Sequence, residues 1–162
     1  MIGNDIVDLA LAQKQSNWKR KGFLAKIFTQ YEQSLIVNSQ NQDCMVWNLW
    51  SRKEAAYKIY NRQTGIRGFF PLQFACDYQN IEKGTVSIKE NIYHTFTEIT
   101  KEFIHTIAVS KTSDLNNIKL LDSKIKIEKV NGIPFIKDVV NQINKPVSIS
   151  HHGRFQINIT IL

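Results

Sequence analysis

The 162-residue sequence has few of the features on which several classes of protein depend. Its two cysteines, Cys44 and Cys76, have no metal-ligand spacing and no partner motif. No apolar run approaches the roughly 20 residues that a membrane span needs. The N-terminus also lacks the basic segment and apolar stretch of a signal peptide. These absences predict a reduced, cytoplasmic, soluble protein with no membrane partner.

Glycine-rich phosphate loops are missing as well. The chain has seven glycines, and they form neither a GxGxxG nor a GxxxxGK[ST] pattern. The first binds dinucleotides in Rossmann folds and the second cradles phosphates in P-loop proteins. Nucleotide binding of either kind is therefore not expected.

Acidic residues are in deficit, with 14 Asp and Glu against 21 Lys and Arg, which gives a formal charge of +7. Such an excess calls for an anionic partner: nucleic acid, a phosphate-rich small molecule or an acidic protein. The densest cluster is Lys19-Arg20-Lys21. One short cluster favours a phosphate pocket or partner patch, with a solvated helix surface as the alternative. A basic nucleic-acid-binding module is a second hypothesis, but no RNP, KH or helix-turn-helix signature accompanies it.

The sequence signals of secondary structure indicate an α+β protein. A strand is expected at Gly3–Leu9, and a long helix from Asp43 to about Asn61 that ends at the glycines of TGIRG. Between them, apolar spacing predicts a helical turn before Thr29. A new helix is expected to start there, because Thr29 and Glu32 form a capping-box pattern.

The second half of the chain is rich in β-branched and aromatic residues separated by turn signals. Three or four strands of an antiparallel meander are expected first, and a surface loop at Asp114–Asn117 follows. An Asn-Gly turn joins two further strands, a short helix is expected around Lys137–Ile143, and a strand pair turns at Gly153. This order predicts an antiparallel sheet packed against a long helix.

Glu54 and Lys58 lie one turn apart on the same side of the long helix. An ordinary exposed ion pair is the simplest interpretation. However, Trp47 and Trp50 share the stripe of Glu54, and a face with two indoles should be buried. A buried carboxylate needs a cation or strong hydrogen bonds to stay charged.

Asp5 raises the same question on the first strand. Asp8 can cap a following helix, whereas Asp5 shares a strand face with Gly3 and Val7. Gly3 would let another backbone or a ligand come close. If Asp5 meets Glu54 across space, a hard divalent ion such as Mg²⁺ would explain the two acids.

The segment VSISHH contains a third polar group of residues. Ser148 and Ser150 share one face of a strand, and His151 follows at its end. His151 could donate to a phosphate or be an ordinary surface residue. A two-histidine zinc site is not expected, because adjacent strand residues point to opposite faces.

Five segments occur in an order that resembles the 4′-phosphopantetheinyl transferase superfamily, in particular its small holo-acyl-carrier-protein synthase branch. They are GNDIV at Gly3–Val7, FLAKIFTQYE at Phe23–Glu32, WSRKEAAYK at Trp50–Lys58, NGIP at Asn131–Pro134 and SISH at Ser148–His151. The helix motif is the most specific of the five. The resemblance implies the superfamily's fold for a single domain at 1–162, with a metal-site half at about 1–112 and a C-terminal β-rich segment at about 118–162.

The resemblance also implies an activity. Such enzymes transfer the 4′-phosphopantetheine arm of coenzyme A to a serine of an acyl or peptidyl carrier protein and release 3′,5′-ADP. Asp5 and Glu54 would bind Mg²⁺, which neutralises developing charge in such transfers. Lys58 would balance the reacting phosphate, and Glu54 or a metal-bound water would take the serine proton.

The remaining site residues follow the same resemblance, except where charge alone suggests them. Ser150 and His151 match the segment that contacts coenzyme A phosphates. Gly65 retains part of the turn after the helix and is grouped with the coenzyme A residues. By charge alone, Arg20 and Lys21 could reach the 3′-phosphate or the acidic carrier protein.

The sequence departs from the family pattern in several places. Asn4 replaces Ile or Val, and Val7 stands where the larger branch often has a third acidic ligand. The chain contains the half that carries the expected metal site and only part of a second half. This favours completion of the active-site cleft by a neighbouring copy of the chain. A trimer is preferred, with a dimer or a self-contained monomer left open. An inactive partner-binding member is a further alternative, against which Asp5, Glu54 and Lys58 argue.

Overall fold

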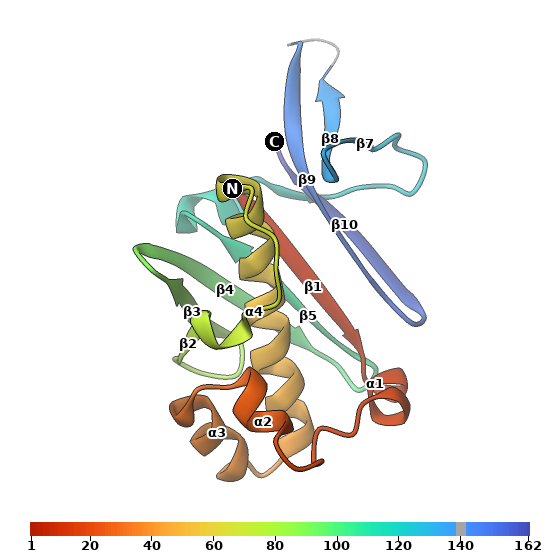
Figure 1. Cartoon of the computed structure of the whole chain (residues 1–162). Coiled ribbons are helices and arrows are strands. Elements are labelled where there is room, and N and C mark those ends of the chain that lie inside the picture. The colour runs from red at the N-terminus through yellow and green to blue at the C-terminus, as the bar shows by residue number, and fades with distance from the viewer. Residues whose placement is uncertain (139–141) are drawn as a thin grey trace.

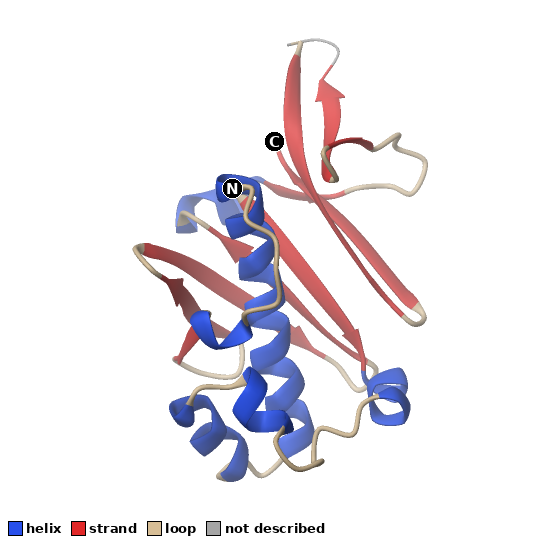
Figure 2. Cartoon of the chain, in the orientation of Figure 1, coloured by secondary structure: helices blue, strands red, loops and turns tan. Residues whose placement is uncertain are grey.

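A computed structural model of the chain describes residues 1–138 and 142–162. Two five-stranded antiparallel sheets make up most of the fold, and helices cover one face of the first sheet (Figures 1 and 2). The elements in chain order are β1 (Ile2–Asp8), α1 (Leu9–Gln15), α2 (Phe23–Ile27), α3 (Gln30–Val37), α4 (Gln42–Thr64), η1 (Pro71–Gln73), β2 (Ala75–Tyr78), β3 (Lys83–Ile88), β4 (Asn91–Ile99), β5 (Phe103–Val109), η2 (Thr112–Asn117), β6 (Ile118–Leu120), β7 (Glu128–Val130), β8 (Ile133–Asp138), β9 (Ile143–His152) and β10 (Phe155–Ile161), where η marks a 3-10 helix. The predicted fold class is confirmed.

Local signals explain where the helices begin and end. Asn41 caps α4 by accepting the Cys44 N–H, and Gly65 ends it with a left-handed φ of 71°. Thr29 and Glu32 form the predicted capping box, so α2 stops before Thr29 and α3 starts after it. These three boundaries were predicted to within a few residues.

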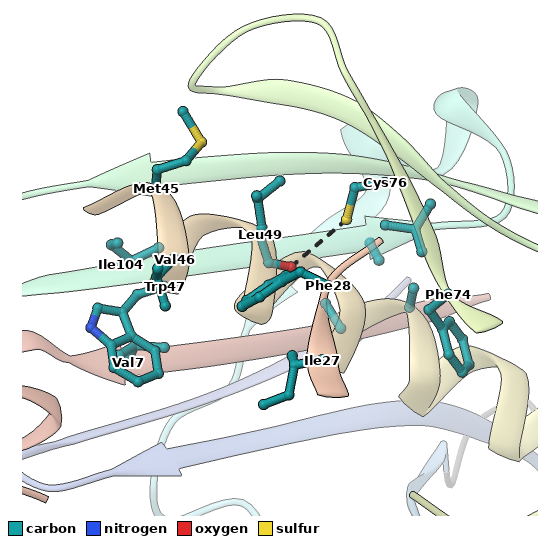
Figure 3. Packing of buried hydrophobic residues seen from close by; sticks show 14 of the residues in the cluster. Val7, Ile27, Phe28, Met45, Val46, Trp47, Leu49, Phe74, Cys76 and Ile104 are labelled. Carbon is teal, nitrogen blue, oxygen red and sulfur yellow. Dashed lines mark hydrogen bonds between the residues drawn. The ribbon is translucent and has the colours of Figure 1, made fainter. Parts of the chain in front are cut away.

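The first sheet has the strand order β1-β5-β4-β3-β2, and α4 crosses one face of it (Figure 1). Between them lies the hydrophobic core, where Val46, Trp47 and Leu49 of α4 pack near Val7 of β1 and Ile104 of β5 (Figure 3). Apolar area removed from water stabilises this layer at roughly 25 cal/mol per Å². The core therefore fixes α4 rigidly against β1, the two elements that carry the predicted acids.

Gly3 allows α4 to approach β1 closely. A Cβ atom on Gly3 would collide with the backbone carbonyl of Ala55 in α4. The expectation that another backbone lies against Gly3 is thus confirmed, and the backbone belongs to α4. Asp5 is two residues from Gly3 and Glu54 is next to Ala55, so the close approach also sets how near the two acids can come.

The second sheet has the order β6-β10-β9-β8-β7 and lies beside β1 (Figure 1). The predicted Asn-Gly turn joins β7 to β8, with positive φ at both Asn131 and Gly132. Long strands β9 and β10 turn at Gly153, as predicted. In place of the loop expected at Asp114–Asn117, the short helix η2 connects the two sheets.

The short helix expected around Lys137–Ile143 is wrong where the structure describes those residues. Lys137 and Asp138 end β8 and pair with Asn144 and Ile143 of β9. An ion pair between Lys145 and Asp138 at 2.7 Å reinforces this hairpin. Periodicity cannot distinguish a helix from a strand in a segment with only a few apolar residues. Here the pairing of β8 with β9 makes the segment a strand. The rest of the expected helix, at 139–141, lies outside the described residues.

Within the parts of the chain described here, no helix is both long and apolar enough to cross a membrane. The 23-residue α4 has sufficient length, but charged residues occur along it.

Candidate active site

β1 carries Asp5 into a cavity of about 400 Å³ between the two sheets and the helical layer. Its side chain is 16% exposed and lies 3.5 Å from the Lys58 ammonium. The Ser150 hydroxyl donates to it at 3.3 Å. Burial nevertheless outweighs these favourable contacts and raises the pKa of Asp5 from 3.8 to about 6.

Glu54 faces the same cavity from α4. Burial raises its pKa from 4.5 to about 7, with the nearby negative charge of Asp5 as the second cause, while Lys58 acts in the opposite direction. Because both carboxyl groups are buried at one cavity and the charge of Asp5 disfavours that of Glu54, a cation between them would favour their charged forms. The structure therefore brings Asp5 and Glu54 to one cavity, as predicted.

Lys58 joins β1 to β9. Its ammonium donates to the backbone carbonyl of Asn4 at 2.6 Å and to that of Ile149 at 3.1 Å, besides its ion pair with Asp5. Sequence spacing suggested Glu54 as its partner, whereas the close carboxylate is Asp5. Lys58 therefore supplies positive charge at the edge of the cavity while holding the two strands together.

Side chains of β9 cover the edge of β1 that does not pair with β5. Backbone N–H groups of β1 at positions 4, 6 and 8 donate in turn to Ser148, Ser150 and His152, at 2.8, 2.7 and 2.8 Å. The period of two in the SxSxH segment matches the period of a strand edge. Ser148 and Ser150 do share a face, as predicted, and that face lies against β1.

Two more of the expected site residues reach the cavity. His151, next to this covered edge, is exposed and lines it. Arg20 also lines it, with its guanidinium 5.5 Å from the ring centroid of Phe23. Asp5, Glu54, His151 and Arg20 thus face one space, although they lie far apart in the sequence.

The other two expected residues lie elsewhere. Lys21 is exposed and is not part of the lining of this cavity. Gly65, at the end of α4, lines a separate hollow with Asn61, Arg67 and Asn131.

Sequence reasoning missed two parts of the site. The first is the exposed Phe69, whose ring lies 6.3 Å from that of Trp50 and extends the apolar wall of the cavity. The second is a neighbouring hollow of about 280 Å³ between α4 and the second sheet, which Lys58 lines together with Arg62 and Lys129. A basic residue four positions after Lys58 was the available signal for Arg62, because i,i+4 residues share a helix face.

Comparisons with known proteins place this geometry in a family. The family model of the 4′-phosphopantetheinyl transferase superfamily matches residues 1–116. The chain belongs to this superfamily. The match contains β1 and α4 with Asp5, Glu54 and Lys58, and it ends before the second sheet.

Solved structures of superfamily members share the fold at low sequence identity. Helicobacter pylori holo-acyl-carrier-protein synthase, solved in complex with coenzyme A, aligns with a TM-score of 0.54 and 19% identity over 67% of this chain and 98% of its own. The Neisseria meningitidis synthase aligns at 0.51 and 14% over 68% and 97%, and the Thermotoga maritima synthase at 0.52 and 14% over 88% and 83%. A search of curated proteins found no match to the sequence.

Proposed function

We propose that this superfamily member transfers 4′-phosphopantetheine from coenzyme A to a serine of an acyl or peptidyl carrier protein and releases 3′,5′-ADP. The observation that carries the proposal is the meeting of Asp5 and Glu54, from two separate elements, in one cavity. His151 and Arg20 line the same cavity and provide groups that can bind phosphate.

The residues present fit a magnesium ion. Asp5 and Glu54 are hard oxygen ligands whose pKa values are raised chiefly by burial, which a bound cation would offset. Val7 lines the cavity where a third acid could have stood. No group of three or more His, Cys, Asp or Glu residues suited to a metal occurs among the described residues. Mg²⁺ commonly keeps several waters and takes one or two carboxylates, so two acids suffice. A bound Mg²⁺ would neutralise charge on the pyrophosphate of coenzyme A.

The distribution of cations suits a substrate with phosphates at separate positions. Arg20 and His151 lie in the cavity of the two acids, and Lys58 lies between that cavity and the hollow of Arg62 and Lys129. Ser150 holds the Asp5 carboxylate by its hydroxyl, so in the proposal it shapes the site as well as facing coenzyme A.

The remaining two predicted residues have more peripheral places in the proposal. The exposed Lys21 would contact the carrier protein or the 3′-phosphate. Gly65 would contribute if bound coenzyme A extends to the hollow beyond α4.

The proposed reaction forms one bond and breaks one. The serine oxygen of the carrier protein attacks the phosphorus that bears the pantetheine arm, and the bond from this phosphorus to the oxygen of 3′,5′-ADP breaks. The leaving oxygen takes the electron pair. Glu54 is a carboxylate of this cavity and is the side chain that would accept the serine proton.

The setting of the reaction is also part of the proposal. Unpaired Cys44 and Cys76 suit the cytoplasm, where holo carrier proteins would serve fatty acid biosynthesis or a related pathway. The trimer stays a prediction. Because β9 already covers the free edge of β1, a trimer would have to form through other surfaces.

Mass spectrometry of carrier proteins incubated with the chain, coenzyme A and Mg²⁺ tests this function. A gain of about 340 Da on one serine, the mass of the phosphopantetheine arm, is expected. The gain should disappear with EDTA and in Asp5→Asn and Glu54→Gln variants that retain the wild-type circular dichroism spectrum. Failure of a broad set of carrier proteins to gain this mass would contradict the proposal.

A further inference from the structure

The tip of the β9–β10 hairpin is fastened to the end of β1 by Asp8 and Arg154. Asp8 is almost fully buried, and its carboxylate accepts from the Arg154 Nε at 2.9 Å, Nη2 at 3.0 Å and backbone N–H at 3.1 Å. A two-pronged guanidinium–carboxylate contact fixes orientation as well as distance. These hydrogen bonds hold the pKa of Asp8 well below its usual range.

Asp8 is itself held in place from the other side. Its Oδ1 caps α1 by accepting the N–H groups of Ala10 and Leu11, at 3.1 and 3.3 Å. Its own N–H donates to His152 Nδ1 at 2.8 Å. One buried carboxylate therefore connects β1, α1 and the hairpin.

The turn between β9 and β10 depends on a glycine. Gly153 has a φ of 54°, and a Cβ atom there would lie 2.5 Å from Asp8 Oδ2 and 2.9 Å from a methyl carbon of Leu11. On the far side of the turn, the Arg154 guanidinium lies 4.9 Å from the ring centroid of Phe155, which packs on Phe103 of β5 at 5.1 Å. The tip is thus seated tightly on the first sheet.

The contacts of the hairpin tip with the first sheet lie next to the proposed coenzyme A site. His151 and His152, three and two positions before Arg154 along the hairpin, line the cavity of Asp5 and Glu54. Ser150 precedes them and donates to Asp5. Any loosening of the tip would therefore displace groups that face the cavity, although Arg154 itself is not among the residues that line it.

We propose that Arg154 is a positioning residue: its contact with Asp8 holds the β9–β10 hairpin so that Ser150 and His151 stay at the cavity of Asp5 and Glu54. The inference rests on the proposed function for its kinetic consequence and on geometry alone for its structural one. It also gives the second sheet, which lies outside the family match, a defined task in the site.

Three variants test the proposal. Arg154→Ala removes the side-chain contact between Arg154 and Asp8, called the clamp below. Arg154→Lys keeps the charge but loses the two-pronged geometry. Lys137→Gln removes an exposed ion pair with Glu128 in the same sheet, far from the tip, and serves as the control.

Hydrogen exchange gives the first readout and needs no activity. In Arg154→Ala, the amides of Asp8 and of residues 148–155 should exchange at least about tenfold faster than in wild type, because local opening exposes them. Arg154→Lys should lie between, and Lys137→Gln should match wild type. Unchanged exchange in Arg154→Ala would overturn the clamp.

Kinetics with coenzyme A give the second readout, well below the melting temperature of each variant. Arg154→Ala should raise the KM for coenzyme A about tenfold with a smaller change in kcat, because binding contacts are lost. Arg154→Lys should restore part of the KM. Faster exchange with an unchanged KM would overturn the positioning role. Absence of transfer by the wild-type chain would instead contradict the proposed function, and the exchange result would still decide the clamp.

Discussion

Asp5 lies 3.5 Å from the Lys58 ammonium, yet its pKa rises to about 6. Lys58 also donates to the carbonyls of Asn4 and Ile149, so its charge is shared with backbone dipoles. One lysine therefore does not compensate two buried carboxyl groups, and the metal-free site favours protons.

The metal-free protein should lose stability as the pH rises from 5 to 8. The pKa values of Asp5 and Glu54 are raised from 3.8 and 4.5 to about 6 and about 7, so the folded state binds more protons than the unfolded state in this window. At about 1.4 kcal/mol per pKa unit, with roughly one unit for Asp5 and two for Glu54 falling between pH 5 and 8, the two carboxyl groups together lower the stability by on the order of 4 kcal/mol. Urea unfolding in EDTA at both pH values measures the change.

His105 requires a matched comparison in this experiment. Its pKa is lowered by burial from 6.5 to about 4, so it makes the folded state more stable as the pH rises through that interval. The combined Asp5→Asn, Glu54→Gln variant retains His105 and should lose less stability than wild type between pH 5 and 8. Equal losses in the two proteins would show that the carboxyl groups are not the cause.

Two serines of β9 offer a matched pair of substitutions. Ser148→Ala and Ser150→Ala each remove the acceptor of a β1 N–H group, from Asn4 and from Ile6, and each should destabilise the fold by about 1–3 kcal/mol. Only Ser150 also donates to Asp5. Ser150→Ala alone should therefore raise the pKa of Asp5, followed by carboxyl NMR, and an equal pKa in both variants would contradict this role.

A buried ion pair joins the middle of α4 to α3. Lys53 lies 2.6 Å from Glu32, which also accepts the N–H groups of Cys76 and Thr29. Lys53→Met should destabilise the fold by about 3–5 kcal/mol, because it leaves a buried carboxylate without its cation. Lys137→Gln, at an exposed pair, should cost no more than about 1 kcal/mol. Similar midpoints of urea unfolding for the two variants would refute the difference.

Local and non-local structure differ in how far the sequence predicts them. The capping box at Thr29, the end of α4 at Gly65 and the turn at Asn131 depend on neighbouring residues, and all three were predicted. The prediction of a helix around Lys137 was wrong, because the pairing of Lys137 with Asn144 in a neighbouring strand outweighs local helix propensity.

The candidate site shows the same division. Asp5 and Glu54 could be paired from their apolar surroundings and from the family motifs. The sequence does not predict that the side chains of Ser148, Ser150 and His152 cover the edge of β1. Such a prediction requires the position of β9 relative to β1. That Asp5 is the close carboxylate partner of Lys58 could not be predicted for the same reason, since the two residues are 53 positions apart in the sequence.

The most direct test of the proposed metal site of Asp5 and Glu54 is divalent-ion binding, with Mn²⁺ as a paramagnetic substitute for Mg²⁺ and coenzyme A present. Electron paramagnetic resonance should show one Mn²⁺ bound per wild-type chain. Asp5→Asn and Glu54→Gln should each weaken binding at least about tenfold while the protein stays folded, as expected when one of two carboxylate ligands is lost. Wild-type affinity in either variant would show that the two acids do not hold one ion.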